Sequence, residues 1–270
     1  MDTSSASSIS GCSITDEIES CLFNASETIK YFGEDFWQLM NNSCGDIELT
    51  MESICFMDYL LKKNKCKTIC DVMCGNARHI LGLHQLGYNV TGIDINRQTL
   101  ESVKDLSIYN SDINLIVADI REYSFSNRYD CISLLTSSLG YYGRDGDIQI
   151  FHNAYQNLND RGIFLLDIPN VEDIRNNTKY RDWCKVDDKY YLFSSKIKSD
   201  IKYNIMRVIN KDNVNEYYMK MQLYSIAELK ELLHQIGFVC IDVYGDFYFT
   251  PISSYDNARR IQIVAQKLLT

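Results

Sequence analysis

The amino-acid sequence predicts an α/β fold built on a mostly parallel sheet, with a small antiparallel insertion. Three observations favour this class. An apolar run that ends at Asp71 is followed by a tight turn, a helical pattern and a second apolar run that ends at Asp94. Helical and strand patterns then alternate as far as Pro169, which is typical of crossover units in a parallel sheet. Beyond Pro169, short extended runs are separated by polar turns, which indicates an antiparallel meander.

The turn after the first apolar run carries Cys74 and Gly75. Because Gly75 has no Cβ, the backbone can approach a ligand closely there. The N-terminus of the next helix offers unpaired N–H groups. Asp94 lies about 20 residues beyond the turn, the distance at which an acid can accept both hydroxyls of a ribose. The third glycine of a dinucleotide fingerprint is missing, so the sequence favours an adenosyl ligand without a pyrophosphate.

The first part of the chain is predicted to be helical. Residues 1–12 are rich in serine and are expected to form a flexible tail, because they lack the basic start and apolar core of a signal peptide. Helices are predicted over residues 14–23, 26–41 and 47–63. Together, residues 13–64 form a predicted helical lid over the strand ends, and residues 65–270 form the main domain, with a β-meander insertion at about 179–223.

The alternating part and the C-terminal part follow in order. Helices are predicted at residues 97–106 and 146–158, and strands at 114–117, 129–135 and 162–167. The meander is expected to contain three strands, at 190–196, 202–209 and 216–223. A capping box of Ser225 and Glu228 begins a helix that Gly237 ends. Strands are predicted at 238–244 and 260–265, joined by a loop over 246–257.

Composition limits the class of protein. A chain of 270 residues, 46% hydrophobic, is long enough for one large α/β domain and is not a disordered chain. No apolar run is long enough for a membrane span. The net charge of −9 argues against binding to nucleic acid or to anionic membranes, and it permits a cationic acceptor such as an amine. A cytoplasmic location is expected.

Ten cysteines in a chain of this length do not indicate a disulfide framework. Cys66, Cys70 and Cys74 recur every four residues. On a strand followed by a turn this spacing does not converge on one point, so no metal site is predicted.

Residues 71–79, Asp-Val-Met-Cys-Gly-Asn-Ala-Arg-His, resemble the first motif of the class I S-adenosylmethionine-dependent methyltransferases, which usually reads Asp-x-Gly-x-Gly-x-Gly. Met73 and Ala77 replace two of its glycines, whereas Gly75, the most diagnostic one, is kept. The resemblance continues at residues 92–94, 118–120, 129–133, 162–167 and at the Leu-x-x-x-Gly-Phe that ends at Phe238, and it covers roughly residues 30–268. It implies a Rossmann-like sheet of seven strands, antiparallel final strands and S-adenosyl-L-methionine as cofactor.

The resemblance and the strand-end positions together imply a set of cofactor-binding residues. Asp94 would accept the ribose hydroxyls, Asp119 the adenine amino group, and Arg78 would reach the cofactor carboxylate. Asp71 and Asp119 could instead be ordinary turn or cap residues, and Arg78 a solvated helix residue. The full set is Tyr31, Asp71, Met73, Cys74, Gly75, Arg78, Asp94, Ile95, Asp119, Ile120 and Leu135.

The acceptor is expected to bind beside the same strand ends, because ligands of open α/β sheets lie there. Asp167 could hold a cationic group of the substrate, or it could have a cap or turn role beside Pro169. Positioning is assigned to Trp37, Thr136, Tyr142 and Asp167. The candidate acceptor pocket consists of Trp37, Thr136, Tyr141, Tyr142, Asp167, Asn170, Tyr248 and Phe249.

Methyl transfer from a sulfonium needs little besides positioning and exclusion of water. An amine must only be neutral, whereas a hydroxyl usually needs a base or a metal. Neither a His-Asp pair nor an Asn-Pro-Pro-Tyr motif is found after the strands. The sequence therefore favours N-methylation of a small molecule or peptide natural product. The alternatives are O-methylation of a small natural product and a non-catalytic adenosyl-binding regulatory subunit.

Overall fold

The computed structural model describes residues 23, 25–41, 44–178, 181–211, 213–252 and 258–268, without the side chains of 44–46. The predicted tail at 1–12 and, except for Phe23, the helix expected at 14–23 lie outside these residues. So does part of the loop expected at 246–257.

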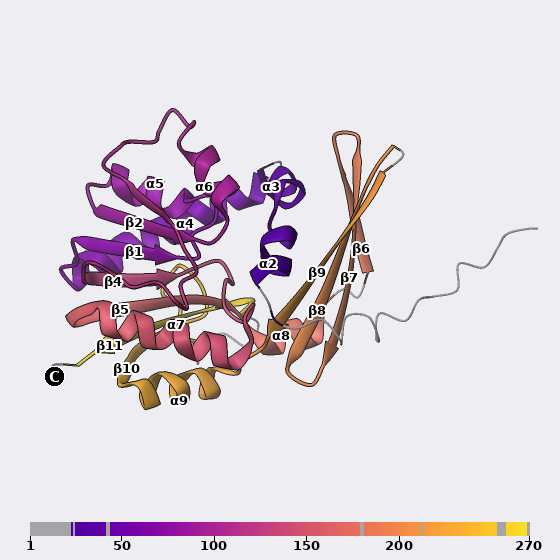
Figure 1. The fold of residues 1–270 in the computed structure, drawn as a ribbon. Coiled ribbons are helices and arrows are strands. Elements are labelled where there is room, and N and C mark those ends of the chain that lie inside the picture. Colours follow the sequence, from indigo (N-terminus) through magenta and orange to yellow (C-terminus); the bar gives the residue numbers. More distant parts are fainter. Residues whose placement is uncertain are drawn as a thin grey trace, which may run out of the picture.

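The main body is a sheet of seven strands in the order β10-β11-β5-β4-β1-β2-β3 (Figure 1). Strands β1 to β5 run parallel, β11 is antiparallel to β5, and β10 is antiparallel to β11. This confirms the predicted Rossmann-like sheet and its antiparallel end. The strands are β1 (Thr68–Val72), β2 (Asn89–Asp94), β3 (Asn114–Val117), β4 (Tyr129–Leu134), β5 (Leu158–Pro169), β10 (Phe238–Tyr244) and β11 (Arg260–Lys267).

Helices cover both faces of this sheet (Figure 1). Neighbouring residues of β1 serve opposite cores: Ile69 packs with Leu61 and Leu83 on one face, and Cys70 belongs to the core with Phe151 on the other. This follows from the alternation of side chains along a strand, and it explains why β1 is apolar at successive positions. The first face carries α4 (Cys44–Lys63), α5 (Arg78–Gln85) and α6 (Arg97–Val103), and the second carries α7 (Gly143–Asn157) and α9 (Ile226–Ile236).

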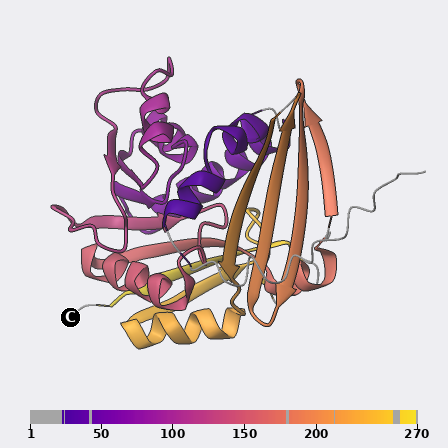
Figure 2. The same cartoon turned by 45° about the vertical axis from the view of Figure 1, so that its right-hand side comes forward.

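A separate antiparallel sheet of four strands stands beside the main body (Figure 2). The three predicted strands are present, and a fourth, β6, precedes them. Strand β6 was not predicted, because most of its side chains are exposed and no apolar alternation marks it. The strands are β6 (Arg181–Val186), β7 (Lys189–Lys198), β8 (Ile201–Asn210) and β9 (Asn213–Gln222).

Two helical predictions need correction. The helix expected over residues 26–41 is divided into α2 (Ala25–Tyr31) and α3 (Glu34–Asn41), and the interruption includes Gly33, a poor helix former. A short helix that was not predicted, α8 (Val171–Asn177), follows Pro169. Its N-cap is Asn170, whose Oδ1 accepts a hydrogen bond of 3.1 Å from the backbone N–H of Glu172.

The predicted ends of α9 are confirmed. The Ser225 hydroxyl accepts from the N–H of Glu228 at 3.2 Å, and the Glu228 carboxylate accepts from the N–H of Ser225 at 2.9 Å. Gly237 ends the helix with a φ of +114°. None of the helices within the described ranges is long and apolar enough to cross a membrane.

Helices α2 and α3 lie between the two sheets (Figures 1 and 2). Asp35 of α3 is buried and accepts hydrogen bonds from Lys189 Nζ (2.8 Å), Tyr217 OH (2.6 Å) and Asn215 Nδ2 (3.3 Å). Because a buried charge must be paired, these contacts with β7 and β9 fix where α3 lies. The four-stranded sheet therefore positions the N-terminal helices.

The loop between β4 and α7 is held by a second buried carboxylate. Asp147 accepts hydrogen bonds from the N–H of Gly140 (3.1 Å) and from the hydroxyl of Tyr224 (2.6 Å). The carbonyl of Gly140 accepts from the N–H of Gln222 at the end of β9 (2.8 Å). Burial raises the pKa of Asp147 to about 7, although its two hydrogen bonds act in the opposite direction.

This raised pKa predicts a measurable dependence of stability on pH. The folded state holds the Asp147 proton more tightly than the unfolded state, so its contribution to stability is lost as pH rises from about 4 to about 7. We expect Asp147→Asn to lose less stability than the wild type between pH 5 and pH 8 in urea titrations. Asp130→Asn is the control, because the pKa of Asp130 is lowered and its carboxylate stays ionised in both states over this range. Parallel pH profiles for the wild type and Asp147→Asn would contradict the assignment.

Candidate active site

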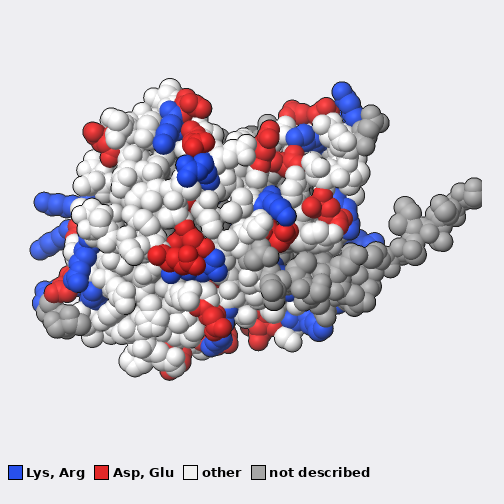
Figure 3. Space-filling model, in the orientation of Figure 1, with Lys and Arg blue, Asp and Glu red and all other residues white. Residues whose placement is uncertain are grey.

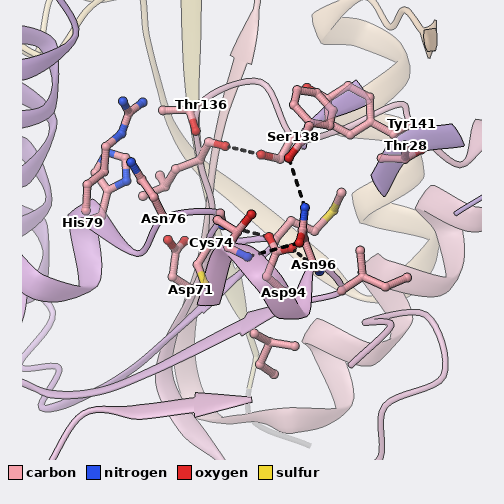
Figure 4. Close-up of a pocket in the computed structure, with 18 of the residues that line it drawn as sticks. Thr28, Asp71, Cys74, Asn76, His79, Asp94, Asn96, Thr136, Ser138 and Tyr141 are labelled. Carbon is pink, nitrogen blue, oxygen red and sulfur yellow. Dashed lines mark hydrogen bonds between the residues drawn. The ribbon is translucent and has the colours of Figure 1, made fainter. Parts of the chain in front are cut away.

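A cavity lies at the carboxyl ends of β1, β2 and β4, against α2 and α3. Figure 4 shows Asp94 near Asn96 in its centre, with His79 and Tyr141 on opposite sides of the view. The structure brings most of the predicted residues together here. Those that line the cavity are Trp37, Asp71, Met73, Cys74, Gly75, Arg78, Asp94, Ile95, Ile120, Leu135, Thr136, Tyr141 and Tyr142.

The turn after β1 has a left-handed backbone at three positions, two of which are not glycine. Met73 and Ala77 have φ values of 59° and 55°, and Gly75 has 54°. For a residue with a Cβ this left-handed conformation costs roughly 1–2 kcal/mol. At Gly75 a Cβ would also lie 2.8 Å from Cη2 of Trp37, so only glycine fits at this position. The altered motif is thus compatible with an intact ligand-binding turn.

The carboxylate of Asp94 connects two loops. Oδ2 accepts a hydrogen bond of 2.7 Å from the N–H of Gly75, and Oδ1 accepts one of 2.8 Å from the N–H of Asn96. Burial raises the pKa of Asp94, and these backbone hydrogen bonds oppose the rise. The predicted ribose contact is stereochemically reasonable, because the carboxylate is held at the cavity wall on the end of β2.

Two further titratable groups in the cavity are already hydrogen-bonded. Asp71 is buried and accepts a hydrogen bond of 2.7 Å from the hydroxyl of Ser133. Burial raises the pKa of Asp71 to about 7. His79 lies 2.9 Å from the Ser53 hydroxyl through Nε2. Burial, assisted by the positive charge of Arg78, lowers the pKa of His79 to about 3, so this imidazole stays neutral near pH 7. His79 is therefore a packed, neutral residue.

Asp167 does not have the role expected for it. Its carboxylate is buried and pairs with Arg260 through Nε (2.9 Å) and Nη2, and it also accepts from Gln262 Nε2 (3.0 Å) and from the N–H of Thr136 (3.0 Å). Four donors occupy its two oxygens. Asp167 therefore binds a cation of the protein itself and does not offer a carboxylate to a cationic substrate.

Two more residues with predicted site roles have other partners. The Asp119 carboxylate, expected to accept from adenine, pairs with Arg121 at 2.5 Å between Oδ2 and Nη2, although its neighbours Ala118 and Ile120 line the cavity. Asn170 caps α8 and donates to the carbonyl of Ala258 at 2.7 Å.

Three aromatic residues of the predicted set also lie away from the cavity lining. Tyr31 is buried in a cluster with Tyr191 of β7. Tyr248 is exposed and donates to Glu52, and Phe249 stacks on Phe56 at a centroid distance of 4.6 Å.

Several lining residues were missed, and Arg260 is the most informative. Because β11 is antiparallel to β5, its first residue lies opposite Pro169 at the end of β5. The start of β11 therefore lies at the same edge of the sheet as the carboxyl ends of the parallel strands. Since the final strand was predicted to be antiparallel, the sequence contained the information needed to place Arg260 at this edge. The other missed residues are Thr28, Ile29, Phe32, Phe36, Met40, Leu49, Asn76, His79, Ile93, Asn96, Thr99, Ala118 and Ser138.

The order of the strands, the turn after β1 and the cavity at the carboxyl ends of the strands together define a Rossmann-like nucleoside-binding site. Residues 69–162 match the family model of the methyltransferase domain. These residues form a methyltransferase domain, and the protein is an S-adenosylmethionine-dependent methyltransferase with S-adenosyl-L-methionine as its methyl donor. It is an enzyme, so the alternative of a non-catalytic subunit is set aside.

Known proteins agree with this family. The chain is 24% identical over 214 residues to the putative methyltransferase YqeM of Bacillus subtilis (strain 168), covering 75% of this chain and 85% of that protein. It is 22% identical over 198 residues to a glycine/sarcosine N-methyltransferase of Aphanothece halophytica, covering 70% of this chain and 73% of that protein. The crystal structure of an S-adenosylmethionine-dependent methyltransferase from Clostridium acetobutylicum ATCC 824 has a similar fold, with a TM-score of 0.71 and 14% identity over 81% and 92% of the two chains.

The first site prediction concerns Asp94. We expect Asp94→Asn to weaken binding of S-adenosylhomocysteine about ten- to hundredfold in calorimetry, because each hydrogen bond to a charged group contributes roughly 1.5–3 kcal/mol. Asp130→Asn is the matched control. Asp130 lies at the opposite end of β4, where it accepts from the N–H groups of Lys67 (2.8 Å) and Thr68 (3.0 Å). Unchanged affinity in a folded Asp94→Asn variant would remove the ribose assignment.

The second site prediction concerns closure of the N-terminal helices. The chain has two tryptophans: Trp37 lines the cavity with its Nε1 buried and without a hydrogen-bond partner, and Trp183 is exposed on β6. We expect S-adenosylhomocysteine to change the fluorescence of the Trp183→Phe variant and not that of Trp37→Phe. Hydrogen exchange of residues 25–41 should also slow on binding. Equal exchange with and without the ligand would show that these helices are only a packed flank.

Proposed function

We propose that this enzyme methylates a nitrogen atom of an amine in a small molecule or a peptide natural product. The observation that carries the proposal is the state of the proton acceptors in the cavity. His79 is hydrogen-bonded to Ser53 and has a pKa of about 3, and Asp71 already accepts from Ser133. Neither is arranged to deprotonate a hydroxyl, whereas an amine that arrives neutral needs no base.

The described residues supply what such a transfer requires. S-adenosylmethionine, when bound, supplies an activated methyl group. Asp94 and the Gly75 turn would hold its ribose, with Ile95 against the adenine and Arg78 at the carboxylate. Phe36, Trp37 and Tyr141 form an aromatic wall that would exclude water and orient the acceptor.

The surface and one relative agree with a small acceptor. On the face shown in Figure 3, acidic and basic side chains are interspersed and form no continuous basic area of the kind that binds nucleic acid. The relative from Aphanothece halophytica is an N-methyltransferase of glycine and sarcosine. Both observations favour an amine of modest size.

The test is the identity of the methylated atom. The enzyme would be incubated with S-adenosylmethionine and matched panels of amines and hydroxyl compounds, and products would be located by mass spectrometry and NMR. We expect transfer to nitrogen, at a rate that rises with pH as the amine loses its proton. The Asp94→Asn variant is the control for cofactor-dependent turnover. A methyl group on oxygen would favour the alternative, O-methylation, and one on sulfur or carbon would also end the amine proposal.

A further inference from the structure

Asn96 connects the expected ribose site with the N-terminal helices. Its backbone N–H donates to Oδ1 of Asp94 at 2.8 Å, and its side-chain Nδ2 donates to the carbonyl of Phe32 at 3.0 Å. Its Oδ1 accepts a hydrogen bond of 3.2 Å from the N–H of Thr99, which makes Asn96 the N-cap of α6. Asn96 is buried and lines the cavity next to Asp94 (Figure 4). One side chain therefore contacts both the loop after β2 and the N-terminal helices.

Phe32 lies at the break between α2 and α3. The end of a helix leaves backbone carbonyl groups without a partner inside the helix, and the amide of Asn96 supplies a donor at this point. The centroid of the Phe32 ring is 4.8 Å from that of Phe36 and 5.0 Å from that of Tyr141, and all three rings line the cavity. The position of Phe32 therefore affects the aromatic side chains that surround a bound ligand.

The same helices cover the turn after β1. A Cβ at Gly75 would lie 2.8 Å from the ring of Trp37, so the indole packs directly against the backbone that is expected to bind the cofactor. The N–H of Trp37 donates to the carbonyl of Gly33 at 3.1 Å, which connects the indole-bearing turn of α3 to the break. Asp35 anchors α3 to the four-stranded sheet, and Asn96 anchors the break to the loop after β2. The second anchor is the one that adjoins the ribose site.

We propose that Asn96 is a positioning residue that couples cofactor binding to closure of α2 and α3. Ribose hydroxyls bound to Asp94 would fix its carboxylate and, through it, the N–H of Asn96. The amide of Asn96 then holds Phe32, and with it the two helices, over the cavity. Because coupling between two sites is reciprocal, the closed helices in turn retain the ligand. The proposal depends on the ribose contact of Asp94 and is independent of the proposed N-methylation.

The two functions of the Asn96 side chain can be separated by substitution. A side chain needs both an acceptor and a donor to cap α6 and to bind the carbonyl of Phe32. Serine is a good N-cap residue, but its hydroxyl is too close to the backbone to reach Phe32. Asn96→Ser therefore removes the contact with the helices and leaves α6 capped.

The first experiment compares Asn96→Ser with the wild type by calorimetry and hydrogen exchange. We expect affinity for S-adenosylhomocysteine to fall about three- to tenfold, the range for one hydrogen bond. In the ligand-bound state, amides of residues 32–37 should exchange faster than in the wild type, and those of residues 99–103 at the same rate. Asn170→Ser is the matched control, because Asn170 caps α8 and donates to the carbonyl of Ala258, and it should change neither measurement.

The second experiment tests whether Asn96 acts through the helices. Affinity for S-adenosylhomocysteine would be measured for Asn96→Ser, for Trp37→Leu and for the double variant. We expect Asn96→Ser to cost at most about twofold in the Trp37→Leu background, because the closed helices then make less contact with the ligand site. A purely local effect on the loop after β2 would give the same loss in both backgrounds.

Each other outcome overturns the coupling. Unchanged affinity in Asn96→Ser would show that the Phe32 contact does not contribute to binding, and equal losses in both backgrounds would show that Asn96 acts only locally. Faster exchange confined to residues 97–103 would assign Asn96 to the cap alone. If Asn96→Ser does not fold, Asn96→Asp keeps the size and the cap but lacks the donor, and full affinity in that variant would contradict the proposal. Failure of the ribose contact is seen separately, as unchanged affinity in Asp94→Asn.

Discussion

The absence of a side chain at Gly75 is the constraint on which the site depends. The turn after β1 brings the Gly75 N–H within 2.7 Å of the Asp94 carboxylate, and the indole of Trp37 lies where a Cβ would otherwise project. One residue thus joins the end of β1, the end of β2 and helix α3. Met73 and Ala77 adopt the same left-handed backbone although each has a Cβ, which carries the energetic cost of that conformation.

The four-stranded sheet shapes the cavity without lining it. Its strands β7 and β9 hold α3 through Asp35, and the end of β9 holds the loop after β4 through Gly140. The helix carries Phe36 and Trp37 of the aromatic wall, and the loop carries Thr136 and Tyr141. An insertion that is distant from the first motif in sequence therefore fixes two sides of the site, because buried carboxyl groups such as those of Asp35 and Asp147 need hydrogen-bond partners and accept few alternative arrangements.

The pair of Asp167 and Arg260 changes what the site can recognise. An acid at the end of β5 would by itself attract a cationic group. With Arg260 bound to it, the carboxylate becomes an internal support and the guanidinium becomes the group that faces the cavity. Arg260, and not Asp167, therefore lines the cavity at this end of the sheet.

The sequence by itself determined the parallel sheet, the Gly75 turn, the capping box of α9 and the cavity position of Asp94, because each depends on residues near one another in the chain. It did not determine β6, whose exposed side chains leave no apolar pattern, or the break between α2 and α3. The partner of Asp167 was decided by tertiary structure alone, whereas Asp119 pairs with Arg121, which is two residues away in the chain. Whether an acid at a strand end faces a ligand or an arginine depends on which side chain the fold brings to it, and Arg260 is 93 residues from Asp167 in sequence.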